Sequence, residues 1–405
     1  MVQAGRGVNV WVMVPLLAAL AMLGPFAIDA YLPAFASIAR SLGATAAQMQ
    51  QTLSAYLLGF AFMNLFHGAL ADRFGRRPVV LWGVGVFAVA SLACALAQTL
   101  TQLIVWRAVQ GLATGAGSVV SRALIRDLYP GAQGQRVMSR VMMCFALAPV
   151  LAPMVGGQLS DRLGWRAVFV FLALFGAAVW WASRRYLPET LRAQDAQPLH
   201  PRHLLRGYAG LLGQPSFLLL ALATGVSFNG IFIYVLAAPA FLGELLRFEP
   251  TQFYLFFMTV VAGMVLGAWA SERLAGRVMP ARQMGWGFGV MGFAASLNVL
   301  AAAHGAALPV GLMFALIALI ALGWSLLMPA AAMQALDLAG NRRGLAASLL
   351  AVVSSVINAL VAGLGALWVM HSIQAMAWGA WTMTVLGWGA WALQHRCRLG
   401  AQRVV

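Results

Sequence analysis

The stretch Gly68–Pro78, GALADRFGRRP, separates two long apolar segments and decides how the chain is organised. Gly68 has no side chain and lets two helices approach closely, whereas Gly75 permits a tight turn before Pro78 starts the next helix. Asp72 can pair with an arginine or face the N-terminus of another helix. A loop that only holds positive charge at the inner membrane surface would explain the arginines. Against this reading, the order G-x-L-x-D-R-x-G-R-R is specific.

The apolar segments beside this loop belong to a pattern that covers the chain. Of its 405 residues, 62% are hydrophobic and only 9% are charged. A soluble protein carries roughly 25% charged residues, and a helix needs about 20 apolar residues to cross a membrane. The candidate spans are 10–33, 48–68, 79–97, 101–123, 137–160, 166–185, 215–240, 252–271, 284–303, 308–330, 344–369 and 373–393. We therefore predict an all-α integral membrane protein with twelve transmembrane helices.

The arginines indicate how these helices are oriented. The chain has 26 basic and 10 acidic residues, a net charge of +16, and every basic residue is arginine. On a soluble protein this charge would suggest nucleic acid, but the arginines are dispersed between apolar segments, so no nucleic-acid partner is expected. With both termini inside, 21 arginines fall in inner segments and 4 in outer loops, while Arg107 lies within a span. Because inner loops carry the excess of basic residues, both termini are predicted to be inside.

A polar stretch divides the twelve segments into two sets of six. We expect an N-terminal six-helix bundle at 1–185, a cytoplasmic linker at 186–214 and a C-terminal six-helix bundle at 215–405. Two equal halves around a basic inner linker are typical of a duplicated transporter that binds its substrate near the membrane midplane, between the halves. His200 and His203 in the linker are better explained as solvated loop residues than as metal ligands, so no metal site is expected.

The segment Gly24–Phe35, GPFAIDAYLPAF, contains Asp29, the only acid that falls inside a predicted span. An ionised carboxylate at that depth costs about 2.5–3.5 kcal/mol on insertion scales, so a chain that keeps one usually uses it. If the helix ended near Asp29, the carboxylate would lie among the lipid headgroups. The apolar character continues beyond Pro33 to the next charge at Arg40, however, and a helix that bends and runs on would place Asp29 near the midplane. We therefore predict a functional carboxylate.

A second charged residue, Arg107, lies in the segment LIVWRAVQG at 103–111. An unpaired guanidinium inside a membrane is costly, so Arg107 needs a partner or water. The alternative is that its long side chain extends to the outer surface. The downstream residues Gly111 and Gly115 form a face of small side chains for close helix packing.

The fifth span concentrates residues that disturb helices, in the segment APVLAPMVGG at 148–157. Pro149 and Pro153 are followed by Gly156 and Gly157. One proline in a span can be a simple kink, but two prolines with paired glycines predict a shaped packing surface.

These patterns resemble the motifs of the major facilitator superfamily, whose fold has twelve helices in two six-helix halves. The loop at 68–78 resembles the family's inner latch between the halves, and 267–277, GAWASERLAGR, resembles a degraded copy with Ser271 in place of the acid, which weakens the case for a second latch. The segment around Arg107 resembles the R-x-x-Q-G motif associated with proton transfer. The fifth span resembles the motif of the antiporter branch, with Ala152 where Gly is usual. The residues so implied are Gly68, Asp72, Arg73, Gly75 and Arg76 for the latch, and Pro149, Pro153, Gly156 and Gly157 for the antiporter motif.

Further segments narrow the resemblance to one group. The segments DAYLPA at 29–34, LSAYLLGFA at 53–61, AAPAF at 237–241 and ALDLAG at 335–340 are similar to those of the Bcr/CflA drug–proton antiporters. The resemblance implies proton-driven export of amphenicol-, bicyclomycin- or sulfonamide-like drugs from a bacterium, across its inner membrane. Asp29 matches the group's membrane-embedded acid and Arg107 its motif arginine, so these two are expected to couple protons to transport. Relatives with a second acid before Asp29 differ from this chain, which makes cationic substrates less expected here.

The expected partners are a small-molecule substrate, protons and membrane lipid, with no cofactor and a monomeric state. Interhelical packing is the alternative role for each of the cavity-lining candidates except Asp29. The nominated substrate-binding residues are Asp29, Tyr56, Gln110, Phe228, Asn229 and Tyr234, with Asn358 as a weaker choice. The alternative function is proton-coupled export of one endogenous metabolite, such as an amino acid or a siderophore. A receptor that no longer transports is a further possibility. No enzyme is predicted, because no span carries HExxH, GxSxG or paired acids.

Overall fold

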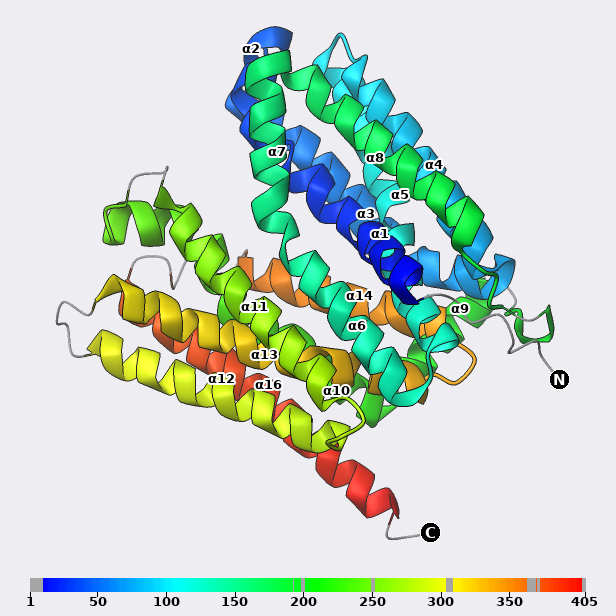
Figure 1. The fold of residues 1–405 in the computed structure, drawn as a ribbon, viewed down its shortest axis with the longest axis vertical. Helices are drawn as coiled ribbons and strands as arrows, with labels where there is room; N and C mark the ends of the chain where they lie inside the picture. Colours follow the sequence, from blue (N-terminus) through cyan, green and yellow to red (C-terminus); the bar gives the residue numbers. More distant parts are fainter. Residues whose placement is uncertain are drawn as a thin grey trace. The chain divides into compact units, whose positions relative to one another are not determined.

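The computed structural model describes residues 10–191, 193–197, 201–248, 252–303, 309–362, 369 and 372–402. In this part of the chain every long element is a helix, and one isolated bridge joins Ala275 and Val278 (Figure 1). The predicted all-α class is therefore confirmed.

Two compact units share the chain. The first unit comprises Met1–Tyr129, Leu147–Leu204 and Asn341–Ser348, and the second comprises Pro130–Ala146, Leu205–Gly340 and Leu349–Val405. The predicted boundaries at 186 and 214 stay a prediction.

The first unit is built around α5, a long helix rich in small residues. Its elements are α1 (Val10–Asp29), a 3-10 turn (Leu32–Ala34), α2 (Phe35–Leu42), α3 (Ala46–Phe74), α4 (Arg76–Ala95), α5 (Leu100–Leu128), α7 (Ala148–Leu163), α8 (Trp165–Tyr186) and a 3-10 turn (Ala193–Asp195). α5 packs against α1, α3 and α4. A Cβ on Gly111 would lie 2.1 Å from the carbonyl oxygen of Tyr56, so glycine is what allows α5 to approach the backbone of α3 this closely.

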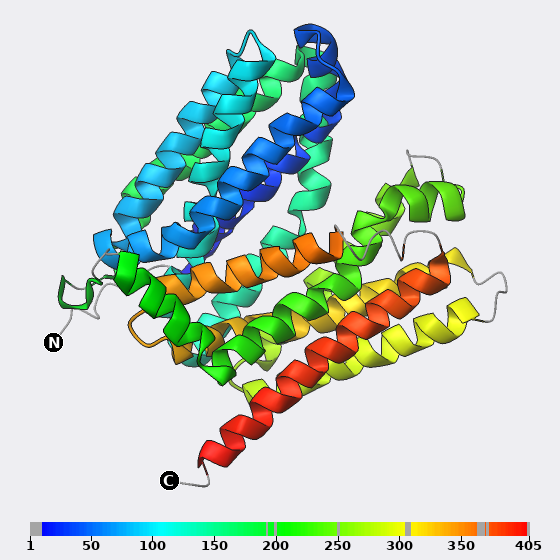
Figure 2. The same cartoon turned by 180° about the vertical axis from the view of Figure 1, so that it is seen from behind.

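The second unit surrounds α13. Its elements are α6 (Gly131–Ala146), α10 (Pro215–Leu236), a π-helical segment (Pro239–Leu245), α11 (Tyr254–Leu274), α12 (Pro280–Ala303), α13 (Val310–Leu338), most of α14 (Arg343–Leu360) and α16 (Ile373–Gln402). α13 packs against α6, α10, α11 and α12, and α16 lies beside α10 (Figure 2). α9 (Pro201–Leu212) crosses from the first unit to the second along the chain.

Eleven of the twelve predicted spans coincide with helices that are long and apolar enough to cross a membrane, among the residues that the structure describes. The first of these spans extends further than predicted, from Val10 to Leu42. The twelfth, 373–393, lies within α16, which has 30 residues but is less apolar than the others because of its tryptophans, threonines and glycines.

Candidate functional site

Asp29 lies at a break inside the first apolar span. α1 ends at this residue, the chain passes through the 3-10 turn Leu32–Ala34, and helix resumes at Phe35–Leu42. Pro33 explains the break, because proline has no N–H to donate and disfavours helical geometry in the residue before it. Leu42, the end of this span, lies 13 residues beyond Asp29 (42 − 29), so Asp29 falls inside the span and not at its end. This is the bent, continuing helix that the sequence predicted.

The glycine-rich part of α7 contacts the chain directly after Asp29. A Cβ on Gly156 would lie 2.0 Å from the carbonyl oxygen of Ala30, so α7 reaches this turn only because residue 156 is glycine. Pro149 lies in the first turn of α7, and α6 ends before it at Ala146, so the predicted fifth span is two helices. The antiporter-like segment thus forms the expected packing surface against the Asp29 turn.

Gly156→Ala is expected to destabilise the protein, whereas Gly157→Ala is not. The added methyl group of the first variant would meet a backbone atom that cannot move aside, and overpacking of this kind costs about 1–3 kcal/mol. A Cβ on Gly157 would meet only Pro33, at 3.8 Å, which is ordinary van der Waals contact. Thermal unfolding of the two purified variants measures the difference, and equal midpoints would contradict the assigned contact.

Arg107 is completely buried in the first unit, with 0% of its surface exposed. Its Nη1 donates to the carbonyl oxygen of Ala27 at 3.0 Å and to Oε1 of Gln110 at 2.5 Å. The guanidinium carbon lies 4.5 Å from the ring centre of Tyr31 and 4.3 Å from that of Tyr56. Two aromatic faces therefore stabilise this cation in place of a carboxylate. The side chain is not extended to the outer surface.

A chain of hydrogen bonds holds these groups in place. Nε2 of Gln110 donates to the hydroxyl of Ser91 at 2.7 Å, and that hydroxyl donates to the carbonyl of Phe87. The hydroxyls of Tyr31 and Thr52 hydrogen-bond to one another, and the hydroxyl of Tyr56 donates to the carbonyl of Gly24 at 3.3 Å. Tyr56 and Gln110, both nominated for substrate binding, are fully buried in this structure and support Arg107.

Asp29 itself is half-buried and free of partners within the described part of the chain. Its carboxylate accepts no hydrogen bond and forms no ion pair there, and Tyr56 lies within electrostatic range of it. Arg107 reaches the backbone of α1 two residues earlier, at Ala27, and does not contact the carboxylate. Asp29 and Arg107 therefore form no ion pair within the described residues.

The nominated residues of the second unit fall into two environments. Phe228 is half-buried and packs against Trp324, with ring centres 4.9 Å apart and ring planes tilted by 51°. Asn229 is buried and donates to Oδ1 of Asn358 at 3.0 Å, while its own Oδ1 has no partner among the described residues. Tyr234 is buried, and its hydroxyl accepts a hydrogen bond from Asn298 at 2.7 Å. Phe228, Trp324 and Asn358 thus combine an aromatic surface with a neutral amide.

Asp72 lies in the last turn of α3, where the sequence suggested a loop, and it binds the start of α14. Its carboxylate accepts from the backbone N–H groups of Gly344 at 3.1 Å and Leu345 at 2.8 Å and pairs with Arg76. The first N–H groups of a helix have no partner within that helix, and its N-terminus favours an anion. Gly68 adds a bond from its N–H to the hydroxyl of Ser348 at 2.9 Å.

The same cluster extends into α5 and the linker. Arg76 and Arg343 both bind the carboxylate of Asp127, at 3.1 and 2.7 Å. Glu189 accepts from the N–H groups of Arg76 and Arg77 and so caps α4. Gly75 turns the chain there with φ of +105°, where a side chain would be strained. Arg73, a predicted member of the latch, is exposed.

The degraded copy of this loop makes a neutral network in the second unit. Ser271 is buried and accepts hydrogen bonds from Gln283 at 2.8 Å and Ser139 at 3.1 Å, and Gln135 donates to Gln283 at 2.8 Å. α6 and α11 are thus joined by amides and hydroxyls where the first loop uses carboxylates. Beside them, Arg140 and Glu272 form a more exposed ion pair.

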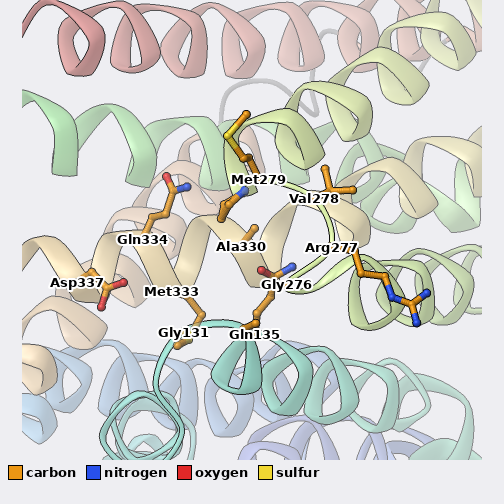
Figure 3. Close-up of a pocket in the computed structure, with 12 residues that line it drawn as sticks. Gly131, Gln135, Gly276, Arg277, Val278, Met279, Ala330, Met333, Gln334 and Asp337 are labelled. Atoms are coloured by element: carbon orange, nitrogen blue, oxygen red, sulfur yellow. The ribbon is translucent and has the colours of Figure 1, made fainter. Parts of the chain in front are cut away.

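A cavity of about 390 Å³ lies in the second unit, next to this network (Figure 3). Its walls come from α6, the turn at 275–280 and α13, with Arg277 and Asp337 at opposite sides of the view. No nominated substrate residue lines it. The cavity is therefore separate from the predicted substrate-binding residues.

Several residues that contact the sites described above were not predicted from the sequence. Tyr31 stands two positions after Asp29, and this spacing could have marked it as a partner of the same site. Trp324 lies in a uniformly apolar helix and gave no signal. Asp127 and Glu189 lie near inner arginines, where an acid is unusual for this chain, and that contrast could have singled them out.

Comparison with curated proteins finds relatives that are named as drug-resistance proteins. The chain is 36% identical over 271 residues to Multidrug resistance protein D of Escherichia coli, and 34% over 259 residues to a Bicyclomycin resistance protein homolog of Haemophilus influenzae. These matches cover 66% and 64% of this chain, and 66% and 65% of the relatives, slightly less than two thirds of their length. Multidrug resistance protein MdtL of Escherichia coli is 32% identical over 367 residues, covering 91% of this chain and 89% of the relative.

Solved structures and a family model identify the fold. A bacterial homologue of the iron transporter ferroportin, in an outward-facing state, has a TM-score of 0.77 at 16% identity, over 95% of this chain and 99% of that one. The proton:xylose symporter XylE has a TM-score of 0.68 at 13% identity, over 96% and 95%. The model of the Major Facilitator Superfamily matches residues 17–362. Because this match covers most of the chain, the protein belongs to the Major Facilitator Superfamily, whose members are membrane transporters and not enzymes.

Proposed function

We propose that the protein is a proton-coupled antiporter that exports small amphipathic drugs across a bacterial inner membrane by alternating access. The observation that carries this proposal is the carboxylate of Asp29, which has no partner among the described residues and lies at a helix break, two residues after the carbonyl that buried Arg107 binds. The names of the relatives, which refer to multidrug and bicyclomycin resistance, support the substrate class.

Asp29 is proposed to bind a proton and the drug alternately. Its carboxylate is half-buried and has no hydrogen-bond or ion-pair partner among the described residues, so it is free to bind either ligand. Burial penalises a charged carboxylate, and proton binding relieves that penalty. Arg107 keeps its charge at every workable pH and fixes the backbone of α1 at Ala27. It therefore holds the backbone of α1 two residues before Asp29 and is proposed to position that residue.

The second unit is proposed to supply the apolar and neutral contacts. Phe228 and Trp324 offer aromatic surface, and the amides of Asn229 and Asn358 offer hydrogen bonds without charge. Such a surface suits a weakly polar, uncharged drug of the amphenicol, bicyclomycin or sulfonamide kind. The cluster of Asp72, Arg76 and the start of α14 acts in this proposal as the inner latch.

A screen of substrate-induced proton flux in proteoliposomes tests the proposal. Vesicles with an acidic lumen and a pH-sensitive dye are exposed to amphenicols, bicyclomycin, sulfonamides, amino acids and siderophores, with protein-free vesicles as the control. Proton release caused by one of the three drug classes is the expected result. A response to amino acids or siderophores alone would favour export of an endogenous metabolite, and silence with every compound would contradict proton-coupled export.

A further inference from the structure

α3 carries a histidine that the proposed transport mechanism does not use. His67 is 3% exposed and Asn64, one helical turn earlier on the same face, is 1% exposed. Nδ1 of His67 and Oδ1 of Asn64 are both buried without a hydrogen-bond partner among the described residues. An unsatisfied buried polar group costs about 1–3 kcal/mol, so two on one face call for an explanation.

Both atoms point to the same place on α5. A Cβ built on Gly115 would lie 2.1 Å from Oδ1 of Asn64 and 2.8 Å from Nδ1 of His67. Only glycine therefore fits at position 115, because the Cβ of any other residue would clash with both polar atoms. The arrangement keeps a titratable ring in the helix interface and offers it no partner there.

His67 is also adjacent to the inner latch. The next residue, Gly68, donates from its N–H to the hydroxyl of Ser348, and a Cβ on Gly68 would clash with the backbone of Gly344. The N–H of Gly344 in turn donates to Asp72. His67 is thus one residue away from the contacts that hold the start of α14.

The buried ring has no counter-charge. The charged side chains on the elements around this part of the first unit are Asp72 and Arg73 on α3, Arg76 on α4, Arg122, Arg126 and Asp127 on α5, and Arg343 on α14. Within the described residues, none of them forms an ion pair with His67 or a hydrogen bond with Nδ1 of its ring. A buried imidazolium without a partner is costly, so the ring stays neutral while it is enclosed.

We propose that His67 is a second proton-binding site, which takes up a proton only when the start of α14 has left Gly68, so that acid pH favours the open latch. The inference rests on the proposed function only in assuming that the latch opens during transport. It needs neither a particular drug nor coupling through Asp29.

Linkage gives the direction and size of the effect. The closed latch binds fewer protons at His67 than the open latch, so closure is fully favoured at high pH and is lost as pH falls. An exposed imidazole titrates near pH 6.5, so between pH 8 and about pH 5.5 the equilibrium shifts about tenfold toward the open state.

Hydrogen exchange of the full-length protein in lipid nanodiscs, without drug, tests this inference. The probes are the amides of Gly344 and Leu345, which donate to Asp72 in the closed latch. After correction for intrinsic exchange, their protection is expected to fall about tenfold in the wild type between pH 8 and about pH 5.5. His67→Gln and His67→Phe, which cannot be protonated, should keep high protection throughout, and the permanently charged His67→Arg should show low protection at both pH values.

Two outcomes would contradict the proposed role of His67. Because Asp72 is unchanged in the neutral variants, a wild-type pH response in His67→Gln and His67→Phe would assign the effect to Asp72 and overturn the proposal. A wild type with no pH response would overturn it as well. Asp29→Asn should show the same loss of amide protection at acid pH as the wild type. The test of His67 is therefore independent of whether the protein exports drugs in exchange for protons.

Discussion

Asp29→Asn is expected to abolish proton-driven efflux against a concentration gradient while leaving a neutral drug able to bind. Asparagine keeps the size and hydrogen-bonding capacity of a protonated carboxyl group but cannot titrate. Among the acids of the first unit's spans, Asp29 alone is half-buried and free of partners within the described residues, whereas Asp72 and Asp127 are engaged by Arg76. Arg107 cannot replace it, because a guanidinium stays protonated at every workable pH.

The same substitution should change how drug binding depends on pH. In the proposed cycle a proton on Asp29 favours the state that releases drug, so binding should weaken as pH falls. In Asp29→Asn this dependence should flatten. The comparison is made in His67→Gln protein, so that the histidine near the latch adds no proton dependence of its own.

Reconstituted protein allows both parts to be measured. Drug flux against its concentration gradient measures the coupling of protons to transport. Equilibrium drug binding at several pH values measures the linkage between proton binding and drug binding. Loss of all binding in Asp29→Asn would point to misfolding, which thermal unfolding of the same sample detects. Wild-type uphill flux in the variant would falsify the mechanism and leave Asp29 with no coupling role.

Asp72→Asn is expected to lower transport strongly while drug binding remains measurable. The carboxylate accepts two backbone N–H groups from the start of α14 and pairs with buried Arg76. An amide presents one oxygen in place of two and carries no charge, so at least one of these bonds is lost. Hydrogen bonds to charged groups contribute about 1.5–3 kcal/mol, which corresponds to a roughly tenfold to hundredfold weaker latch.

Glu272→Gln is the matched control for this substitution. Glu272 pairs with Arg140 at 2.6 Å, but the two side chains are 18% and 34% exposed, and an exposed pair is worth about 0–1 kcal/mol. Transport by Glu272→Gln should therefore stay close to that of the wild type. If purified Asp72→Asn loses drug binding as completely as a variant of the substrate-binding residues, Asp72 does not act as a latch.

The positions of the helices and of the principal buried charges could be predicted from the sequence. Hydropathy located eleven spans, because a membrane requires about 20 apolar residues in a row. The cost of burying charge singled out Asp29 and Arg107, and the bend at Pro33 followed from proline geometry. These features depend on local composition, which a single sequence contains.

The partners of the charged groups could not be predicted in the same way. Arg107 was expected to need a partner or water, but the sequence did not identify the partner. It lies between Tyr31 and Tyr56 and on the carbonyl of Ala27, which depends on how three helices pack. His67 falls inside the predicted span 48–68, yet nothing in its neighbours shows that Gly115 would lie beside it.

Drug accumulation in proteoliposomes under an imposed pH gradient tests the central claim most directly. One pH unit corresponds to about 1.4 kcal/mol, so vesicles with a lumen about one unit more acidic should concentrate a drug up to tenfold if one proton exchanges for each molecule. The drug is expected to accumulate in the lumen above its external concentration. This accumulation should disappear when a protonophore collapses the pH gradient. Equal drug concentrations on both sides, with or without the gradient, would contradict it.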